Sequence, residues 1–279
     1  MALSKKRVAL VIGSGGIKCA AAIGMWNVLK DEIAVDLIVG CSGGSVYSGC
    51  IARGATVEYM AEWSKEIWTA DIMQGYTTNL KAARDGSLKF NESSGLVDDS
   101  YLNKALEKVA FDMTFADTNI PLKIIATDLM TGEKVILSEG KIKDAVRASS
   151  AIPMIFPPWE INGRLLIDGG VSDPLPIDVA IQEGADIIIA MGFSLSYRKR
   201  FRSMTAVQEQ LNSIYMNNIL NASFAFHNLA HHAEIFPILP EFDEPLSMFD
   251  VKKIPDIIAK GEEATSMHLP HIKRLLDSL

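Results

Sequence analysis

A glycine-flanked serine at the end of an apolar segment constrains this chain more than any other feature. Residues 35–39 are mostly apolar and predict a buried strand, residues 45–52 are compatible with a helix, and residues 40–44 between them have the sequence Gly-Cys-Ser-Gly-Gly. A sharp strand-to-helix turn with the pattern Gly-x-Ser-x-Gly holds its serine in a strained conformation, and the glycines give the chain room to turn back. A serine hydroxyl becomes a useful nucleophile only beside a base and oxyanion donors. Ser42 is therefore a candidate nucleophile whose partners must come from elsewhere in the chain.

A second glycine-rich segment lies between a predicted strand at residues 8–12 and a predicted helix at residues 20–30. Its sequence is Gly13-Ser14-Gly15-Gly16-Ile17-Lys18. Strand, glycine loop and helix together form a nest of backbone N–H groups that binds a phosphate or an oxyanion. The nucleotide-binding pattern Gly-x-x-x-x-Gly-Lys-Ser/Thr is absent, and Lys18 stands where the last glycine of Gly-x-Gly-x-x-Gly would fall. A loop that only turns the chain is the alternative to an anion site.

Alternating strands and helices predict the fold class. Further strands are expected at residues 122–127, 134–137, 160–167 (a hairpin) and 185–191, and helices at residues 56–73, 96–111, 142–150 and 177–183. Residues 74–95 lack a clear period and predict a long loop. Strands that are apolar throughout and alternate with helices favour an α/β fold, with a largely parallel sheet covered on both faces.

The character of the chain changes after residue 194. Apolar residues recur at three- and four-residue steps between residues 204 and 229, which predicts one long helix whose apolar side packs in the core; a lipid-binding face is the alternative. Residues 251–279 predict one or two closing helices. We expect a single domain over residues 1–279, with a motif-bearing core at about 6–195 and a helical extension at about 196–279 that packs on the sheet.

Charge and composition narrow the classes of partner. The formal net charge is −7, which gives no general electrostatic case for nucleic acid. Residues 197–202, Tyr-Arg-Lys-Arg-Phe-Arg, are a local exception that predicts either a solvated loop or contact with anionic lipid headgroups. The three cysteines suggest no disulfide framework, and no apolar run approaches the ~18 residues of a membrane span. A cytoplasmic location is expected, with peripheral membrane contact as an open alternative.

The sequence offers two kinds of residue that could be the general base for a serine nucleophile. All five histidines lie in the C-terminal helical part, and the order serine, aspartate, histidine permits a hydrolase triad; they are His227, His231, His232, His268 and His271. The other candidate is Asp168, which ends an apolar strand and precedes Gly169 and Gly170. A carboxylate partly buried between glycine turns has a raised pKa and can accept the serine proton itself. His227 and His231 are spaced as metal ligands could be, but no glutamate completes a metalloprotease pattern, and no metal is expected.

Four sequence blocks in a fixed order resemble the patatin-like phospholipases, a family of serine lipid acyl hydrolases that work with a Ser–Asp dyad. The blocks are residues 13–18 with Ile23-Gly24, residues 40–44, Ala-Ser-Ser-Ala-Ile-Pro at 148–153 continuing to residue 158, and Asp-Gly-Gly-Val at 168–171. The resemblance spans roughly residues 8–192. It implies a three-layer α/β/α sandwich with a central, mostly parallel sheet, and a reaction that needs neither a metal nor a cofactor.

The same resemblance assigns roles to individual residues. It implies that Ser42 is the nucleophile, that Asp168 is the base, and that the backbone N–H groups of Gly15 and Gly16 form the oxyanion hole. The remaining residues of the matched motifs support the site; they are Gly13, Ser14, Lys18, Gly40, Gly44, Gly169 and Gly170. The implied substrate is a lipid or acyl ester, cleaved as by a phospholipase A, a lysophospholipase or an acyl esterase.

Four positions depart from the family's usual residues. Ser14 and Cys19 stand where glycine is usual, Cys41 replaces a common threonine, and Lys18 replaces arginine, which keeps the charge and loses the planar fork. None of these changes removes a catalytic group, so activity is expected. Two other hypotheses stay open at this point: a histidine-dependent esterase of the α/β-hydrolase type, and a non-catalytic protein that binds a phosphate or an acyl group.

Overall fold

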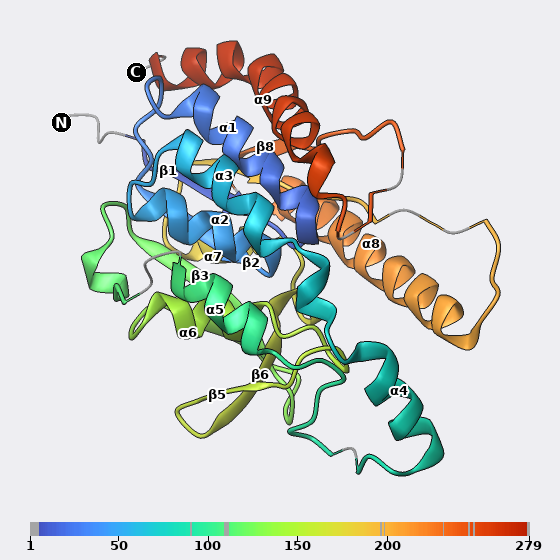
Figure 1. The fold of residues 1–279 in the computed structure, drawn as a ribbon. Helices are drawn as coiled ribbons and strands as arrows, with labels where there is room; N and C mark the ends of the chain where they lie inside the picture. The colour runs from blue at the N-terminus through green and yellow to red at the C-terminus, as the bar shows by residue number, and fades with distance from the viewer. Residues whose placement is uncertain are drawn as a thin grey trace.

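The computed structural model describes residues 6–89, 91–108, 112–195, 197, 199–230, 232–244, 246–247 and 249–277. Within these ranges, eight strands form one mixed sheet with helices on both faces (Figure 1). The strands are β1 (Val8–Ile12), β2 (Leu37–Cys41), β3 (Leu122–Asp128), β4 (Lys134–Leu137), β5 (Trp159–Ile161), β6 (Arg164–Asp168), β7 (Ile187–Met191) and β8 (Glu234–Ile238). The α-helices are α1 (Ala21–Leu29), α2 (Gly43–Ala52), α3 (Val57–Ile67), α4 (Tyr76–Asp85), α5 (Ser100–Lys108), α6 (Ile142–Ser149), α7 (Ile177–Gln182), α8 (Met204–Ala230) and α9 (Ile254–Asp277).

The sheet has a parallel part and an antiparallel part. Its hydrogen-bonded path runs β5-β6-β3-β2-β1-β7-β8, with β4 also paired to β3. The neighbours from β3 to β8 are parallel, and β4, β5 and β6 pair antiparallel. Every residue of β1, β2 and β7 is buried, because helices cover both faces of a parallel sheet. The predicted α/β sandwich is confirmed.

The pairing of β3 explains how two distant segments meet. Ile125 of β3 pairs with Cys41 at the end of β2, and the next residue, Ala126, pairs with Asp168 at the end of β6. β4 pairs with both residues from the opposite side of β3. Since a strand has only two sides, β2 and β6 lie end to end along the same side of β3 and run toward each other. The residue after β2, Ser42, therefore meets the last residue of β6.

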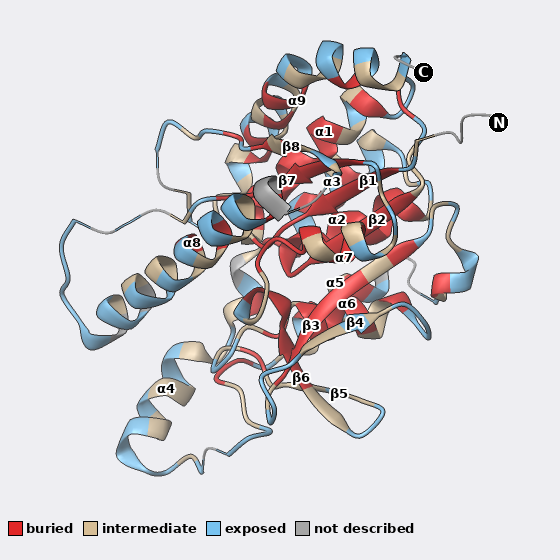
Figure 2. Cartoon of the chain, turned by 180° about the vertical axis from the view of Figure 1, so that it is seen from behind, coloured by how far each residue is buried: buried red, intermediate tan, exposed pale blue. Residues whose placement is uncertain are grey.

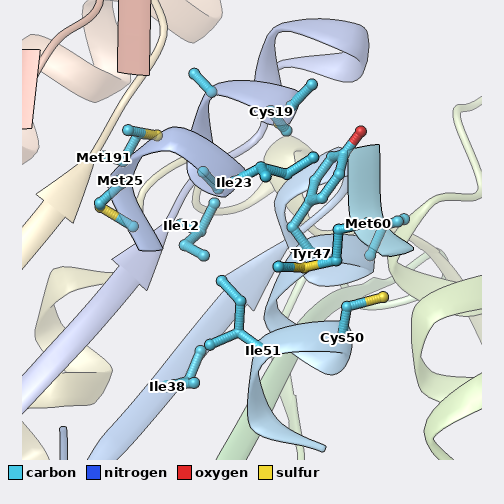
Figure 3. Close-up of a cluster of buried hydrophobic side chains, with 14 of the residues drawn as sticks. Ile12, Cys19, Ile23, Met25, Ile38, Tyr47, Cys50, Ile51, Met60 and Met191 are labelled. Atoms are coloured by element: carbon cyan, nitrogen blue, oxygen red, sulfur yellow. The ribbon is translucent and has the colours of Figure 1, made fainter. Parts of the chain in front are cut away.

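Two apolar layers fill the spaces between sheet and helices. On one face, side chains such as Ile12 and Ile38 pack against α1, α2 and α3 in the cluster that contains Tyr47 (Figure 3). On the other face, Val11 and Val39 pack against residues of α7 and α8. Helix α9 lies on α1 through two glycines: a Cβ on Gly261 would be 2.0 Å from the carbonyl oxygen of Ala21, and one on Gly24 would be 2.1 Å from that of Ile258.

Three elements differ from the sequence-based expectations. Helix α4 lies within residues 74–95, which were expected to form a loop. Strand β8 follows residues 185–191, the last strand expected, and it contains Pro237, which the sheet accommodates because β8 is an edge strand. The expected helix at residues 96–111 is α5, and residues 109–111 lie outside the described part of the chain.

A fourth element, α8, also differs from the expectation. Its apolar repeat was expected to pack in the core, yet Met204, Val207, Leu211 and Tyr215 are exposed. Of its described side chains, Asn217, Leu220 and His227 are buried, and these begin only at the midpoint of the helix. Among the described residues, no helix combines the length and the apolar character that crossing a bilayer requires.

Candidate active site

The turn between β2 and α2 holds Ser42 in a conformation that few non-glycine residues adopt. Its φ is 53° and its ψ is −129°. Such left-handed backbone costs an L-residue on the order of 1–3 kcal/mol and persists only where neighbours enforce it. The neighbours here are backbone atoms in close approach: a Cβ on Gly44 would lie 2.3 Å from the carbonyl oxygen of Ile12, and one on Gly40 would lie 2.7 Å from Ser45 Cα. The glycines of the motif are thus required by space.

A second serine braces this turn from α6. The backbone N–H of Ser42 donates to Ser149 Oγ at 2.8 Å, and Ser149 Oγ donates to the carbonyl oxygen of Ile125 at 2.6 Å. Ser149 is buried. In the sequence this residue is marked only by its place in the block at 148–153, and its contact with Ser42 requires the packing of α6 against β3.

Ser42 and Asp168 form a direct hydrogen bond. The hydroxyl Oγ of Ser42 donates to Oδ2 of Asp168 at 2.6 Å, and the other carboxylate oxygen accepts from the backbone N–H of Gly170 at 2.8 Å. The backbone N–H of Asp168 donates to the carbonyl oxygen of Ala151 at 2.9 Å, and Thr127 Oγ1 donates to the carbonyl oxygen of Asp168. The carboxylate is therefore fixed at both oxygens and at its backbone, facing the serine.

Burial sets the basicity of this carboxylate. Asp168 is 6% exposed and Ser42 is 8% exposed. Burial raises the pKa of Asp168 from 3.8 to about 6, and the hydrogen bonds from Ser42 and Gly170 offset part of the rise. At neutral pH the group is mostly ionised and is a stronger base than a carboxylate on the surface. This combination can take a proton from an attacking hydroxyl.

The glycine loop at residues 13–18 lies beside the serine turn. A Cβ on Gly43 would lie 3.0 Å from the backbone nitrogen of Gly16, so the two turns are in contact. Gly16 has a φ of +57°, and a Cβ on Gly15 would be 2.6 Å from the ring of Phe193. The N–H groups of Gly13 and Ser14 donate to carbonyl oxygens of neighbouring segments. In the described part of the chain, no backbone acceptor is recorded for the N–H groups of Gly15 and Gly16.

Two polar side chains of the loop have different surroundings. Lys18 is buried; its Nζ donates to the carbonyl oxygen of Ser194 at 2.9 Å and lies over the ring of Phe242, and burial lowers the pKa of its ammonium group. It ties the loop to the segment after β7. The hydroxyl of Ser14 is buried, with no partner among the described residues, and lies 3.0 Å from where a Cβ on Gly170 would be.

The histidines contact other parts of the fold. His227 lines a cavity of about 610 Å³ between α7 and α8, together with Asp173 and Asp178. His268 and His271 pack edge-on against the ring of Phe236 in β8. His232 is exposed, and His231 lies outside the described residues. Across the described ranges, no group of three or more His, Cys, Asp or Glu side chains is arranged to hold a metal ion.

Comparison with protein families and sequences places this chain among known proteins. The model of the family described as "Patatin-like phospholipase" matches residues 10–181. An uncharacterised NTE family protein of Mycobacterium tuberculosis is 35% identical over 193 residues, which cover 68% of this chain and 50% of that protein. The human patatin-like phospholipase domain-containing protein 6 is 29% identical over 196 residues, 68% of this chain and 13% of that protein. The chain spans about half the length of the mycobacterial relatives.

Solved structures share the fold at low sequence identity. VipD from Legionella pneumophila superposes with a TM-score of 0.55 and 14% identity, over 96% of this chain and 67% of that one. Human GIVD cytosolic phospholipase A2, solved in complex with methyl gamma-linolenyl fluorophosphonate, has a TM-score of 0.50 and 10% identity, over 98% of this chain and 58% of that one. At this identity the likeness shows a common fold.

Proposed function

This chain belongs to the patatin-like phospholipase family, and from that premise we propose that it is a serine hydrolase that cleaves fatty acyl ester bonds of lipids. The observation that carries the proposal is the 2.6 Å hydrogen bond from Ser42 Oγ to Asp168 Oδ2, made by a serine on a strained strand-to-helix turn. Nucleophile and base within hydrogen-bond reach, with the base itself held by other groups, are the signature of an activated serine. Asp168 is the proposed base and Ser42 the proposed nucleophile.

The proposed first step transfers the acyl group to the serine. Ser42 Oγ attacks the ester carbonyl carbon while its proton passes to Asp168. The carbonyl oxygen becomes an oxyanion, which the N–H groups of Gly15 and Gly16 stabilise, and in comparable sites one such donor contributes about 3–4 kcal/mol to the transition state. The bond to the alcohol then breaks, and the departing oxygen takes the proton from Asp168. The product that leaves is the alcohol part of the lipid.

The proposed second step returns the enzyme to its starting state. A water molecule gives a proton to Asp168 and attacks the acyl carbon, and the same loop stabilises the second oxyanion. The bond to Ser42 Oγ breaks, and the serine recovers the proton. One carboxylate thus acts as base and then as acid in each half-reaction, as general acid–base catalysis requires. Its fixed orientation between Ser42 and Gly170 suits this repeated exchange.

Turnover assays of the purified chain test the proposal. With a chromogenic acyl ester and with phospholipid and lysophospholipid substrates, we expect Ser42→Ala and Asp168→Asn each to reduce kcat at least about a thousandfold. Alanine variants of the five histidines serve as matched controls and should retain turnover. Loss of turnover in a histidine variant that folds normally would show that a histidine is the base, and near-wild-type turnover in Asp168→Asn would show that Asp168 is not the base. Ligand binding without turnover in the wild type would support a binding protein.

A further inference from the structure

The N-terminal half of α8 projects from the body of the protein (Figure 1), and its described residues there are exposed or only partly buried (Figure 2). Met204, Val207, Leu211 and Tyr215 follow one face of the helix at three- and four-residue steps and are exposed by 85%, 44%, 38% and 59%. Of the described side chains between residues 204 and 216, none is buried. This half of the helix therefore has an apolar face that no part of the described fold covers.

The charge content of α8 is unusual for a helix in water. Its 27 residues include one carboxylate, Glu209, and neither lysine nor arginine. By contrast, the 24 residues of α9 include seven charged ones. Exposed helices ordinarily carry charged residues on the face that meets water, and exposed apolar patches rimmed by polar residues mark binding surfaces. The composition of α8 fits an apolar environment on its outer face.

The segment before α8 is basic. Lys199, Arg200 and Arg202 are exposed and, within the described ranges, form no ion pair. Tyr197 before them and Phe201 among them are also exposed. The chain as a whole has a net charge of −7. A basic segment beside an apolar helix face, in an otherwise acidic chain, is complementary to anionic headgroups above an acyl layer.

We propose that Tyr197 and residues 199–202, together with the exposed apolar face of α8 formed by Met204, Val207, Leu211 and Tyr215, dock this protein on an anionic lipid surface. A second copy of the chain is a poorer occupant, because α8 offers a single carboxylate to meet the basic segment of a partner. The inference rests on the proposed function in one respect, that a lipid hydrolase must reach its substrate in a membrane. Docking itself requires no turnover, and the two can be tested apart.

The inner face of the same helix touches the candidate site. Met216 Cε lies 2.9 Å from where a Cβ on Gly170 would be, next to the turn that follows Asp168. The amide of Asn217 bonds both the N–H and the carbonyl of Leu195, at 2.8 and 2.9 Å, and so fixes the helix to the segment after β7. A bilayer against the outer face of α8 therefore lies on the side of the molecule where the Asp168–Gly170 turn is found.

Vesicle flotation tests the docking surface. The reference protein is Ser42→Ala, which leaves the lipid intact, and the vesicles contain two parts phosphatidylcholine to one part phosphatidylglycerol, or phosphatidylcholine alone. We expect tighter binding to the anionic vesicles, weakened by salt. Each basic residue near such a surface contributes about fivefold to the binding constant. The triple change Lys199→Gln, Arg200→Gln and Arg202→Gln should thus reduce binding roughly a hundredfold.

Matched variants distinguish binding through this surface from a general effect of the protein's net charge or of any exposed apolar residue. The control for the basic segment changes three exposed lysines elsewhere to glutamine, Lys65, Lys104 and Lys252, and alters the net charge equally. The pair Leu211→Ser and Tyr215→Ser should lower binding at least about tenfold, whereas Met267→Ser, at an exposed apolar residue of α9, should not. Circular dichroism and melting curves establish that each variant is folded.

Three outcomes would overturn the inference. The first is absence of binding to either kind of vesicle. The second is an equal loss of binding in the control variant with three lysines changed elsewhere. The third is a concentration-dependent dimer that the α8 variants dissociate, which would identify a second copy of the chain as the occupant. If the wild type hydrolyses dispersed esters but binds no vesicle, the docking surface is refuted and the proposed function stands. If Ser42→Ala binds anionic vesicles as expected while the wild type has no turnover, the proposed function is refuted and the docking surface stands.

Discussion

The substitution Asp168→Asn should make the protein more stable at neutral pH and should do so in a pH-dependent way. Burial raises the pKa of Asp168 to about 6 from an ordinary 3.8. A difference of about two pKa units corresponds to about 3 kcal/mol. Because the native state holds this proton more tightly than the unfolded chain, the free energy of unfolding falls as pH rises between these two values and stays lower above about 6. Asparagine keeps an oxygen for the N–H of Gly170 and has no charge to bury.

Urea unfolding followed by tryptophan fluorescence measures this effect. The free energy of unfolding of Asp168→Asn relative to wild type should increase by about 2 kcal/mol between pH 4 and pH 8, because the remainder of the effect lies below pH 4. Asp128→Asn is a control with a different pH window. The hydrogen bond from Arg164 lowers the pKa of Asp128, so its ionised form stabilises the fold; this variant should lose stability relative to the wild type as pH rises toward about 4 and should change little between pH 4 and pH 8. A relative stability of Asp168→Asn that does not change between pH 4 and pH 8 would refute the reasoning.

Three further predictions concern catalysis and packing. The kcat/KM should rise with pH to a plateau, with a midpoint near pH 6, because Asp168 must be ionised to accept a proton. A midpoint near pH 4 would show that burial does not raise the pKa of Asp168. Ser149→Ala leaves the N–H of Ser42 without its acceptor. This variant should lower the free energy of unfolding by about 1–3 kcal/mol and kcat at least tenfold, with little change in KM. An unchanged kcat would show that the turn keeps its conformation without Ser149. Gly261→Ala should lower the Tm by several degrees, since its Cβ would clash with the backbone of α1. An unchanged Tm would mean that α9 can move away from α1 without loss of stability.

The proximity of Ser42 to Asp168 could be predicted from the sequence, but not from local patterns alone. Gly-x-Ser-x-Gly after a strand identified the serine, and the resemblance identified the aspartate. The physical reason for their meeting is that β2 and β6 approach each other along one side of β3. That arrangement depends on an antiparallel strand in a mostly parallel sheet, which no periodicity of the sequence specifies. Ser149 was missed for the same reason, because its contact with Ser42 depends on tertiary packing.

The errors in secondary structure have identifiable physical causes. Proline counts against a strand, yet Pro237 is tolerated in β8 because an edge strand needs hydrogen bonds on one side only. In α8, three- and four-residue spacing of apolar residues correctly predicted a helix, but periodicity cannot say whether the apolar face meets a core or another surface. The assumption that it meets the core was wrong for Met204 to Tyr215, and this exposed face is the basis for the proposed docking surface.

Labelling with a fluorophosphonate probe tests the proposed Ser–Asp dyad most directly. Intact mass spectrometry of the wild type, Ser42→Ala and Asp168→Asn reports whether a serine is activated, which serine it is, and whether Asp168 is responsible. We predict one adduct on the wild type, none on Ser42→Ala, and labelling of Asp168→Asn slowed at least about a hundredfold. An adduct that persists in Ser42→Ala, an undiminished rate in Asp168→Asn, or no adduct on folded wild type would contradict the dyad.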